Sequence, residues 1–426
     1  MANKLLIKIG LWLYNLIWSI LLPFLRLNRR LAEGFDQRTL RYSPQPADLW
    51  IQAASAGEAY LARELLEALH PFKPVRIHMT TNTRQGLEIL EGAVGGIDTH
   101  KNIVSVSAAY FPFDHPTIMK NAVKSIQPRT MVLLESEMWP GLLAALKKYN
   151  CKTLIINGRI TARSLSRYLW WSSLWRSIKP HKILAISEDD ARRFSVLFGN
   201  AHVAVMSNIK FDRFDHDYYT SEGKNPLEKI IPPATPFLVL GSIRQEEESQ
   251  IEKIITNIYQ KNPEPIIGLF PRHIHRVKYW QDIFNRTKRP FVLRSRINQN
   301  IADGTVILWN TFGELSQAYA LSTAAFVGGS LAPLGGQNFL EPLSCGVLPV
   351  IGPSWENFAW VGTEIVKEGL IRVAADWMEV ADALLSDLND PKDRETVSEA
   401  AFKYIRDRQG GAVRAAQIIA ETLNNP

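Results

Sequence analysis

Phe326-Val327-Gly328-Gly329-Ser330 is followed closely by Gly335-Gly336-Gln337-Asn338 and then by Glu341-Pro342. An apolar run that ends in paired glycines is typical of a strand entering a tight loop, and we expect this loop to lead into a helix whose first turn carries Asn338 and Glu341. Backbone N–H groups at such a loop attract a phosphate, and a carboxylate one turn into the helix can accept hydrogen bonds from ribose hydroxyls. The stretch therefore predicts a nucleotide site, and an ordinary strand-to-helix turn is the alternative.

The composition indicates a folded protein with more than one domain. The chain has 426 residues, of which 46% are hydrophobic and 21% charged, and this length favours two domains. The net charge of +7 favours anionic partners. Nucleic-acid binding is not expected, because the sequence has no zinc-finger spacing and no RNA-binding signature, whereas an anionic membrane surface or a phosphorylated lipid accounts for the charge. With only Cys151 and Cys345, we expect no disulfide framework and a reducing, cytoplasmic location.

The N-terminus carries one long apolar segment, residues 9–25, with lysines before it and Arg26, Arg29 and Arg30 after it. Its length is near the lower limit for crossing a bilayer, and no small-residue cleavage site follows it. Aromatic residues within the segment and arginines beyond it favour an interfacial helix or a single short anchor, with the body of the protein on the cytoplasmic side of the membrane. A buried core helix is the alternative.

From about residue 45 the chain alternates short apolar runs with longer amphipathic ones, which is typical of βαβ units and parallel sheets. Residues 212–236 are rich in Asp, Tyr, Lys and Pro, and we expect them to link two such series. The predicted strands are, in the first series, 49–53, 75–80, 103–107, 130–134, 153–157, 182–185 and 202–205, and, in the second, 237–241, 265–270, 291–293, 305–309, 324–327 and 347–351.

An ordered set of short motifs extends from the first series into the second. The motifs are Ser55-Ala56-Gly57-Glu58, Glu135-Ser136-Glu137-Met138-Trp139-Pro140, Asn157-Gly158-Arg159, Lys210-Phe211-Asp212, Pro271-Arg272-His273, Gly313-Glu314-Leu315, and the glycine stretch already quoted. Together they resemble the 3-deoxy-D-manno-octulosonic acid (Kdo) transferases of lipopolysaccharide synthesis. The resemblance implies an α/β fold of the GT-B class, in which two Rossmann-like domains face a central cleft.

The resemblance also implies how the domains divide the work. We expect an N-terminal membrane anchor or interfacial helix (1–30), an acceptor-binding domain (31–211), a linker (212–236), and a nucleotide-sugar-binding domain with C-terminal helices (237–426). The implied activity is inverting transfer of Kdo from CMP-Kdo to a lipid A precursor at the inner membrane, with no cofactor. Two alternatives remain open: a GT-B enzyme that uses another nucleotide-sugar, as a transferase or an epimerase, and a non-catalytic basic protein of the membrane surface.

Inverting transfer requires a base that takes the proton of the acceptor hydroxyl. Glu58 follows the predicted strand 49–53 and opens a helix, so from its spacing alone it is a simple first-turn glutamate. The resemblance implies instead that Glu58 is the catalytic base. It also implies that Glu135, at the end of strand 130–134, and Lys210 stabilise the transition state. Without the resemblance, Glu135 would be interpreted as a carboxylate in a loop and Lys210 as a surface charge.

The donor residues are expected after the strands of the second series, where Arg272 can clamp a phosphate. By resemblance the donor-binding set is Ser242, Pro271, Arg272, Phe312, Gly313, Glu314, Gly336, Asn338, Phe339, Leu340 and Glu341. No metal site is expected, since His273 and His275 lack a third partner and no Asp-x-Asp pair is present. The sequence departs from the family pattern at Gln337, where the family has His, and in the loop 242–247.

A basic and aromatic stretch lies in the first series and carries Arg159, Arg163, Arg167, Arg176 and Lys179 among Tyr168, Trp170, Trp171 and Trp175. Cations for phosphates beside rings for acyl chains favour a site for an anionic amphiphile. Helical packing, with these rings in the core, explains the same pattern.

Overall fold

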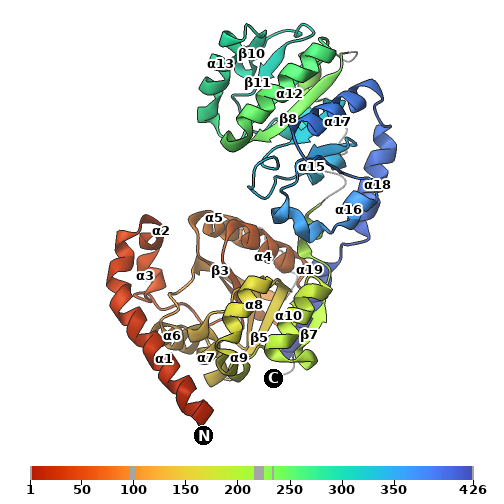
Figure 1. Ribbon diagram of the computed structural model, residues 1–426. Coiled ribbons are helices and arrows are strands. Elements are labelled where there is room, and N and C mark those ends of the chain that lie inside the picture. The colour runs from red at the N-terminus through yellow and green to blue at the C-terminus, as the bar shows by residue number, and fades with distance from the viewer. Residues whose placement is uncertain (1, 96–101, 215–224, 233–234, 425–426) are drawn as a thin grey trace. The chain divides into compact units, whose positions relative to one another are not determined.

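The computed structural model describes residues 2–95, 102–214, 225–232 and 235–424 (Figure 1). The chain divides into two compact units, one made of Met1–Phe214 with Arg408–Pro426 and the other of Asp215–Asp407. Both are α/β units built on a seven-stranded parallel sheet. The expected pair of Rossmann-like domains of the GT-B class is therefore confirmed.

The sheet of the first unit has the strand order β3-β2-β1-β4-β5-β6-β7. Its direction of growth reverses between β1 and β4, which pair in parallel with Leu49 opposite Thr130. Such a reversal is the place where open α/β sheets bind ligands, at the carboxyl ends of the strands. The strands are β1 (Leu49–Ala53), β2 (Val75–Thr81), β3 (Ile103–Tyr110), β4 (Thr130–Leu134), β5 (Lys152–Gly158), β6 (Lys182–Ala185) and β7 (Val203–Val205).

Helices cover both faces of this sheet, as a parallel sheet requires. In β1, Leu49, Ile51 and Ala53 face one core cluster, while Trp50 faces the other. The helices are α1 (Ala2–Leu21), α2 (Arg29–Ala32), α3 (Phe35–Arg38), α4 (Ala56–Ala68), α5 (Arg84–Val94), α6 (Pro116–Ile126), α7 (Pro140–Lys148), α8 (Ala162–Leu169), α9 (Ser172–Ser177), α10 (Glu188–Phe198) and α19 (Gly411–Asn424), with short 3₁₀ helices η1 (Leu22–Leu27), η3 (Asn200–His202) and η4 (Ile209–Arg213).

The second sheet has the order β10-β11-β9-β8-β12-β13-β14 and reverses between β8 and β12. Its strands are β8 (Phe237–Ile243), β9 (Ile266–Pro271), β10 (Phe291–Leu293), β11 (Val306–Leu308), β12 (Ala324–Val327), β13 (Pro349–Ile351) and β14 (Arg372–Val373). Its helices are α12 (Glu248–Lys261), α13 (Val277–Arg286), α14 (Leu315–Leu321), α15 (Leu340–Ser344), α16 (Glu364–Lys367), α17 (Trp377–Asn389) and α18 (Arg394–Arg406), with 3₁₀ helices η5 (Pro226–Lys229), η6 (Gln245–Glu247), η7 (Ile274–Arg276), η8 (Arg294–Arg296) and η9 (Glu356–Val361).

The C-terminal helix α19 belongs to the first unit, whereas the sequence assigned all of 237–426 to the second domain (Figure 1). Its apolar stripe, which includes Ala415, Ala416 and Ile419, is buried in the core cluster that also contains α4. The Asp212 carboxylate fixes its beginning by accepting hydrogen bonds from the N–H groups of Gly410 and Ala412, both at 2.6 Å. The second domain of the sequence analysis therefore ends about where α18 ends.

The expected linker is only partly visible, because residues 215–224 and 233–234 lie outside the described residues. The first described residues of this linker lie at the end of η4, which packs in the first unit. The second portion, η5, belongs to the other unit, where the Asn225 amide donates to the carbonyl of Gln317 at 2.7 Å.

The N-terminal apolar segment is helical, and its residues Ile9–Leu27 are long and apolar enough to cross a membrane, with a mean hydropathy of 1.4. None of this stretch is buried inside the protein. Trp12, Ile20 and Phe24 are all more than half exposed. The segment is nevertheless tied to the body of the unit, because the Tyr14 hydroxyl donates to Asp114 at 2.8 Å and Ser19 lies 3.1 Å from the Nε2 atom of His115. This helix is a candidate anchor, and the buried core helix is the weaker interpretation.

Candidate functional site

Three candidate residues of the first unit lie near the carboxyl edge of its sheet, around the reversal point. Glu58 follows β1 and Glu135 follows β4, the two strands between which the order reverses. Lys210 lies in η4, which follows β7. The sheet therefore brings together residues that are distant in sequence.

Glu58 sits in the first turn of α4, where Ser55 caps the helix. One carboxylate oxygen accepts the Ala54 N–H at 2.6 Å and the other accepts the Ser55 hydroxyl at 3.1 Å. Burial, followed by the charge of Glu137, raises the pKa of Glu58 to about 8, although these hydrogen bonds favour the ionised form. Glu58 thus caps a helix, as its spacing indicated, and also has the proton affinity of a general base near neutral pH.

Glu135 forms an ion pair with Lys210, whose Nζ atom lies 2.7 Å from the carboxylate. The backbone of Glu135 is left-handed, with φ of 54°, a conformation that is costly for a residue other than glycine and that is often found at functional sites. The loop that carries Lys210 is fixed by Asn157, whose side chain accepts the Ile209 N–H at 3.0 Å. Both members of the pair are therefore held in place by neighbouring strand ends.

Glu137 is a third carboxylate at this edge, which the sequence analysis did not include among the site residues. Trp139 donates its indole N–H to Glu137 at 2.6 Å. Burial raises the pKa of Glu137, and the hydrogen bond from Trp139 opposes that rise. Gln52 is fully buried in β1 and accepts the Thr80 hydroxyl at 2.6 Å. The repeat Glu135-x-Glu137 was a signal for this residue, but only the turn after β4 places it near Glu58.

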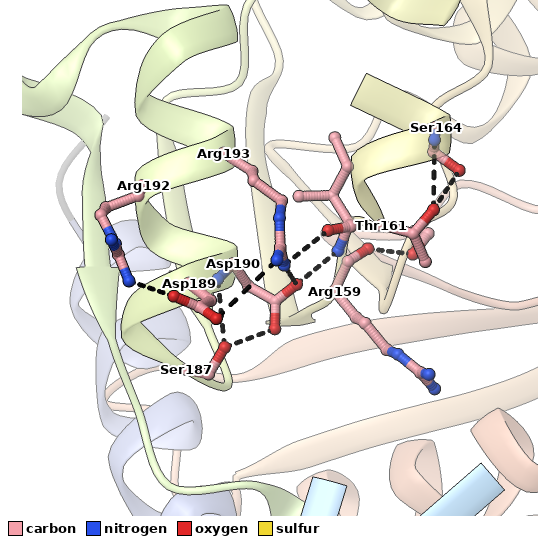
Figure 2. Close-up of polar contacts among 10 residues, drawn as sticks. Arg159, Thr161, Ser164, Ser187, Asp189, Asp190, Arg192 and Arg193 are labelled. Carbon is pink, nitrogen blue, oxygen red and sulfur yellow. Dashed lines mark hydrogen bonds and ion pairs between the residues drawn. The ribbon is translucent and has the colours of Figure 1, made fainter. Parts of the chain in front are cut away.

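The loop after β5 holds Arg159 through its backbone (Figure 2). The Ser136 hydroxyl donates to the Arg159 carbonyl, and Asp190 accepts the Ile160 N–H at 2.8 Å. Figure 2 shows the Arg159 guanidinium pointing away from the cluster of Asp189, Asp190 and Arg193. The cation is therefore not used by this cluster.

In the second unit the candidate donor residues lie at the carboxyl ends of four neighbouring strands, β11, β9, β8 and β12, or in the loops that follow them, so they gather at one edge of the sheet. Glu247 joins two of these loops, a role that the sequence analysis missed. It is fully buried and accepts the N–H groups of Arg244 at 2.9 Å, Gly329 at 2.6 Å and Leu331 at 3.3 Å. A Cβ at Gly328 would lie 2.5 Å from the Glu247 carboxylate, which explains the glycine.

Ser242 and Gly336 have positive φ, at 57° and 78°, so the chain turns sharply at both positions. Asn338 lies before α15 rather than in its first turn, and its side chain accepts the Leu340 N–H at 3.2 Å. Gln337 packs over Gly329, and its Cγ atom lies 3.1 Å from the position that a Cβ on Gly329 would occupy.

Two carboxylates of the second unit have opposite environments. Burial raises the pKa of Glu314, but hydrogen bonds from Thr311, Arg294 and Trp309 outweigh burial and hold the pKa below its usual value. Burial raises the pKa of Glu341, for which no hydrogen bond to the carboxylate is found within the described part of the chain. Glu314 is thus committed to its own loop, and Glu341 retains acceptor capacity for a ligand.

The other donor candidates differ in exposure. Arg272, beside Pro271, has an exposed side chain, and its backbone N–H donates a hydrogen bond to the Ile243 carbonyl at 2.8 Å. Phe312, next to Gly313, is 83% exposed. Phe339 and Leu340 are fully buried, so they contribute packing and backbone. Among the described residues there is no group of three or more His, Cys, Asp or Glu side chains that could hold a metal.

In the basic and aromatic stretch, some rings are packed in the core and others are exposed, so each of the two interpretations given above fits part of it. Trp175 is 5% exposed and belongs to the core. Trp170 and Trp171, by contrast, are 87% and 54% exposed, and Arg163, Arg167 and Arg176 are exposed as well.

Comparison with known proteins gives a consistent result. Residues 30–213 match the family model of 3-deoxy-D-manno-octulosonic-acid transferases. The chain is 29% identical over 407 residues to 3-deoxy-D-manno-octulosonic acid transferase of Haemophilus influenzae, covering 93% of this chain and 92% of the relative, and 28% identical to that of Bordetella pertussis, covering 89% of each. A solved structure, Anabaena Alr3699/HepE in complex with UDP, has a TM-score of 0.57 at 15% identity over 89% of this chain and all of that one, which is a likeness of fold. The chain therefore belongs to the Kdo transferase family and is a glycosyltransferase of the GT-B class.

Proposed function

We propose that the protein transfers Kdo from CMP-Kdo to a lipid A precursor with inversion at the transferred sugar. The observation that carries the proposal is the set of charged groups at the reversal point of the first sheet: Glu58, with a pKa raised to about 8, beside the ion pair of Glu135 and Lys210. The ionised form of a carboxylate with this pKa binds a proton more tightly than that of an ordinary glutamate, as a general base must.

In the proposed reaction the acceptor oxygen forms the new glycosidic bond while the bond between Kdo and the CMP phosphate breaks. The proton of the acceptor hydroxyl passes to Glu58, and CMP leaves with the bonding electrons on its phosphate. Lys210 stabilises the negative charge that develops during transfer, and Glu135 holds Lys210 in position through their 2.7 Å contact. Family membership supports these roles, because both residues lie in motifs that resemble those of the Kdo transferases.

The loops at the edge of the second sheet support binding of a cytidine nucleotide. The exposed Arg272 offers a guanidinium for a phosphate. Glu341, with acceptor capacity left on its carboxylate, suits ribose hydroxyls. The turns at Ser242, Gly313 and Gly336, all with positive φ, support this proposal because such turns allow a ligand to approach the backbone closely.

The acceptor and the location are supported by the candidate anchor Ile9–Leu27 and the exposed arginines that follow α1. A phosphorylated lipid at the cytoplasmic face of the inner membrane meets both the apolar helix and these cations.

Purified protein in detergent tests the proposal. Given CMP-Kdo and a tetraacylated lipid A precursor, it is expected to release CMP only when both substrates are present. Turnover of a uridine sugar without an acceptor, and none of CMP-Kdo, would identify a different GT-B enzyme. Glu67→Gln provides a matched control for Glu58→Gln, because Glu67 lies on the same helix but is 64% exposed.

A further inference from the structure

We propose that an apolar cavity between α1, α8 and α9 of the first unit binds an acyl chain of the lipid acceptor. This inference rests on the proposed function, since it assigns a place to one part of that substrate. The cavity has a volume of about 560 Å³ and lies entirely within one unit. Pockets of this size commonly hold small molecules.

The walls of the cavity suit a hydrocarbon. Leu13 and Ile17 of α1 form one side. The other side is formed by Tyr168 of α8, Leu174 of α9 and Trp171, which lies between these two helices. Gly10 permits close approach of the two sides, because a Cβ there would lie 3.0 Å from the Trp171 ring. A cavity lined in this way gains free energy by enclosing methylenes.

Arg167 is the only charged side chain among the described residues that line the cavity, and it is exposed. Arg163 lies one turn before it on α8 and is also exposed. Within the described part of the chain, neither arginine forms an ion pair with a carboxylate. Two free cations beside an apolar cavity match an amphiphile with a phosphorylated head group.

The position of the cavity favours the acceptor over a phospholipid of the surrounding membrane. Pro140, which lines it, begins α7 directly after the loop that carries Glu135 and Glu137. Asp114 connects α1 with the same helix, because it accepts the Tyr14 hydroxyl at 2.8 Å and the N–H groups of Gly141 at 2.9 Å and Leu142 at 2.7 Å. A chain held here leaves its head group close to the proposed catalytic carboxylates.

A pair of neighbouring tryptophans offers a matched test in the full-length protein. Trp171 lines the cavity, whereas Trp170 does not and is 87% exposed. For the tetraacylated acceptor, Trp171→Ala is expected to lower kcat/KM about tenfold and Trp170→Ala to leave it unchanged. For the deacylated glucosamine disaccharide bisphosphate, both variants are expected to match wild type. Equal losses in the two variants, or an equal loss of Trp171→Ala on both acceptors, would overturn the proposal.

Photocrosslinking tests the cavity without relying on turnover. The probe is the tetraacylated acceptor with a diazirine at the end of one acyl chain, in detergent with the full chain. We expect labelled peptides from α1 and α9 that unlabelled acceptor suppresses and phosphatidylglycerol vesicles do not. Labelling elsewhere, or equal suppression by phosphatidylglycerol, would overturn the assignment even if the enzyme transfers Kdo. Specific labelling without any transfer would leave the cavity assigned and refute the proposed function.

Discussion

Replacing Glu137 by Gln is expected to shift the pH dependence of transfer to lower pH. After burial, the charge of Glu137 is the largest influence that raises the pKa of Glu58 to about 8. Only the ionised form of Glu58 can accept the proton of the acceptor hydroxyl, so in wild type kcat/KM should rise with pH until Glu58 is ionised.

The size of the effect follows from the pKa of Glu58. With a pKa of about 8, roughly a tenth of the molecules carry an ionised Glu58 at pH 7 and about half at pH 8. The rate should therefore rise about ninefold from pH 6 to 7, about fivefold from pH 7 to 8, and less than about twofold beyond. Loss of the neighbouring charge is expected to lower the midpoint by about one unit, which corresponds to roughly 1.4 kcal/mol.

The assay is kcat/KM for CMP release at constant ionic strength between pH of about 5.5 and about 9.5, a range that includes the wild-type midpoint of about 8 and the lower midpoint expected for Glu137→Gln. Glu67→Gln, on the same helix as Glu58, should keep the wild-type midpoint. A midpoint of Glu137→Gln equal to or higher than that of wild type would refute the interaction between Glu137 and Glu58, and a flat wild-type profile would remove Glu58 as the base.

Three further outcomes are expected. Lys210→Ala should lower kcat by about 10²–10³-fold with an unchanged circular dichroism spectrum, because it removes a cation at the developing charge; near-wild-type kcat would exclude that role. Glu247→Ala should destabilise the second unit by roughly 3 kcal/mol, because three backbone N–H groups lose their buried acceptor, and an unchanged thermal denaturation curve would contradict this. The thermal stability of Glu58→Gln should exceed that of wild type by an amount that grows as pH rises from about 5 to 8. Folding raises the pKa of Glu58 from 4.5 to about 8, so the wild-type carboxyl contributes stability below the pKa of the unfolded state and loses it as pH rises through the pKa of the folded state. A stability difference that does not depend on pH would show that Glu58 has no raised pKa.

The sequence predicted the two sheets well, for a physical reason. Buried parallel strands are continuous apolar runs between turn residues, so β1, β4 and β12 were placed to the residue. The two-residue strand β14 carries no such signal. The apolar stripe of α19 predicts a packed helix but does not say which core receives it. The structure buries the stripe in the core cluster that contains α4, and Asp212 fixes the start of the helix.

The candidate site was predicted in part. Only the resemblance to the Kdo transferases placed Glu58, Glu135 and Lys210 in one site, because from its spacing alone Glu58 is a first-turn glutamate and Lys210 a surface charge. Glu137 and Glu247 were not expected, because their roles depend on the direction in which a side chain points after a turn. The roles assigned to all of these residues in transfer remain predictions.

The most direct test of the central claim is the mass of the lipid acceptor after incubation with CMP-Kdo and either wild type or Glu58→Gln. We predict that wild type adds Kdo to the tetraacylated acceptor and that Glu58→Gln, although folded, adds none. Addition of Kdo by Glu58→Gln at the wild-type rate, or CMP release by wild type with no gain in acceptor mass, would contradict the account.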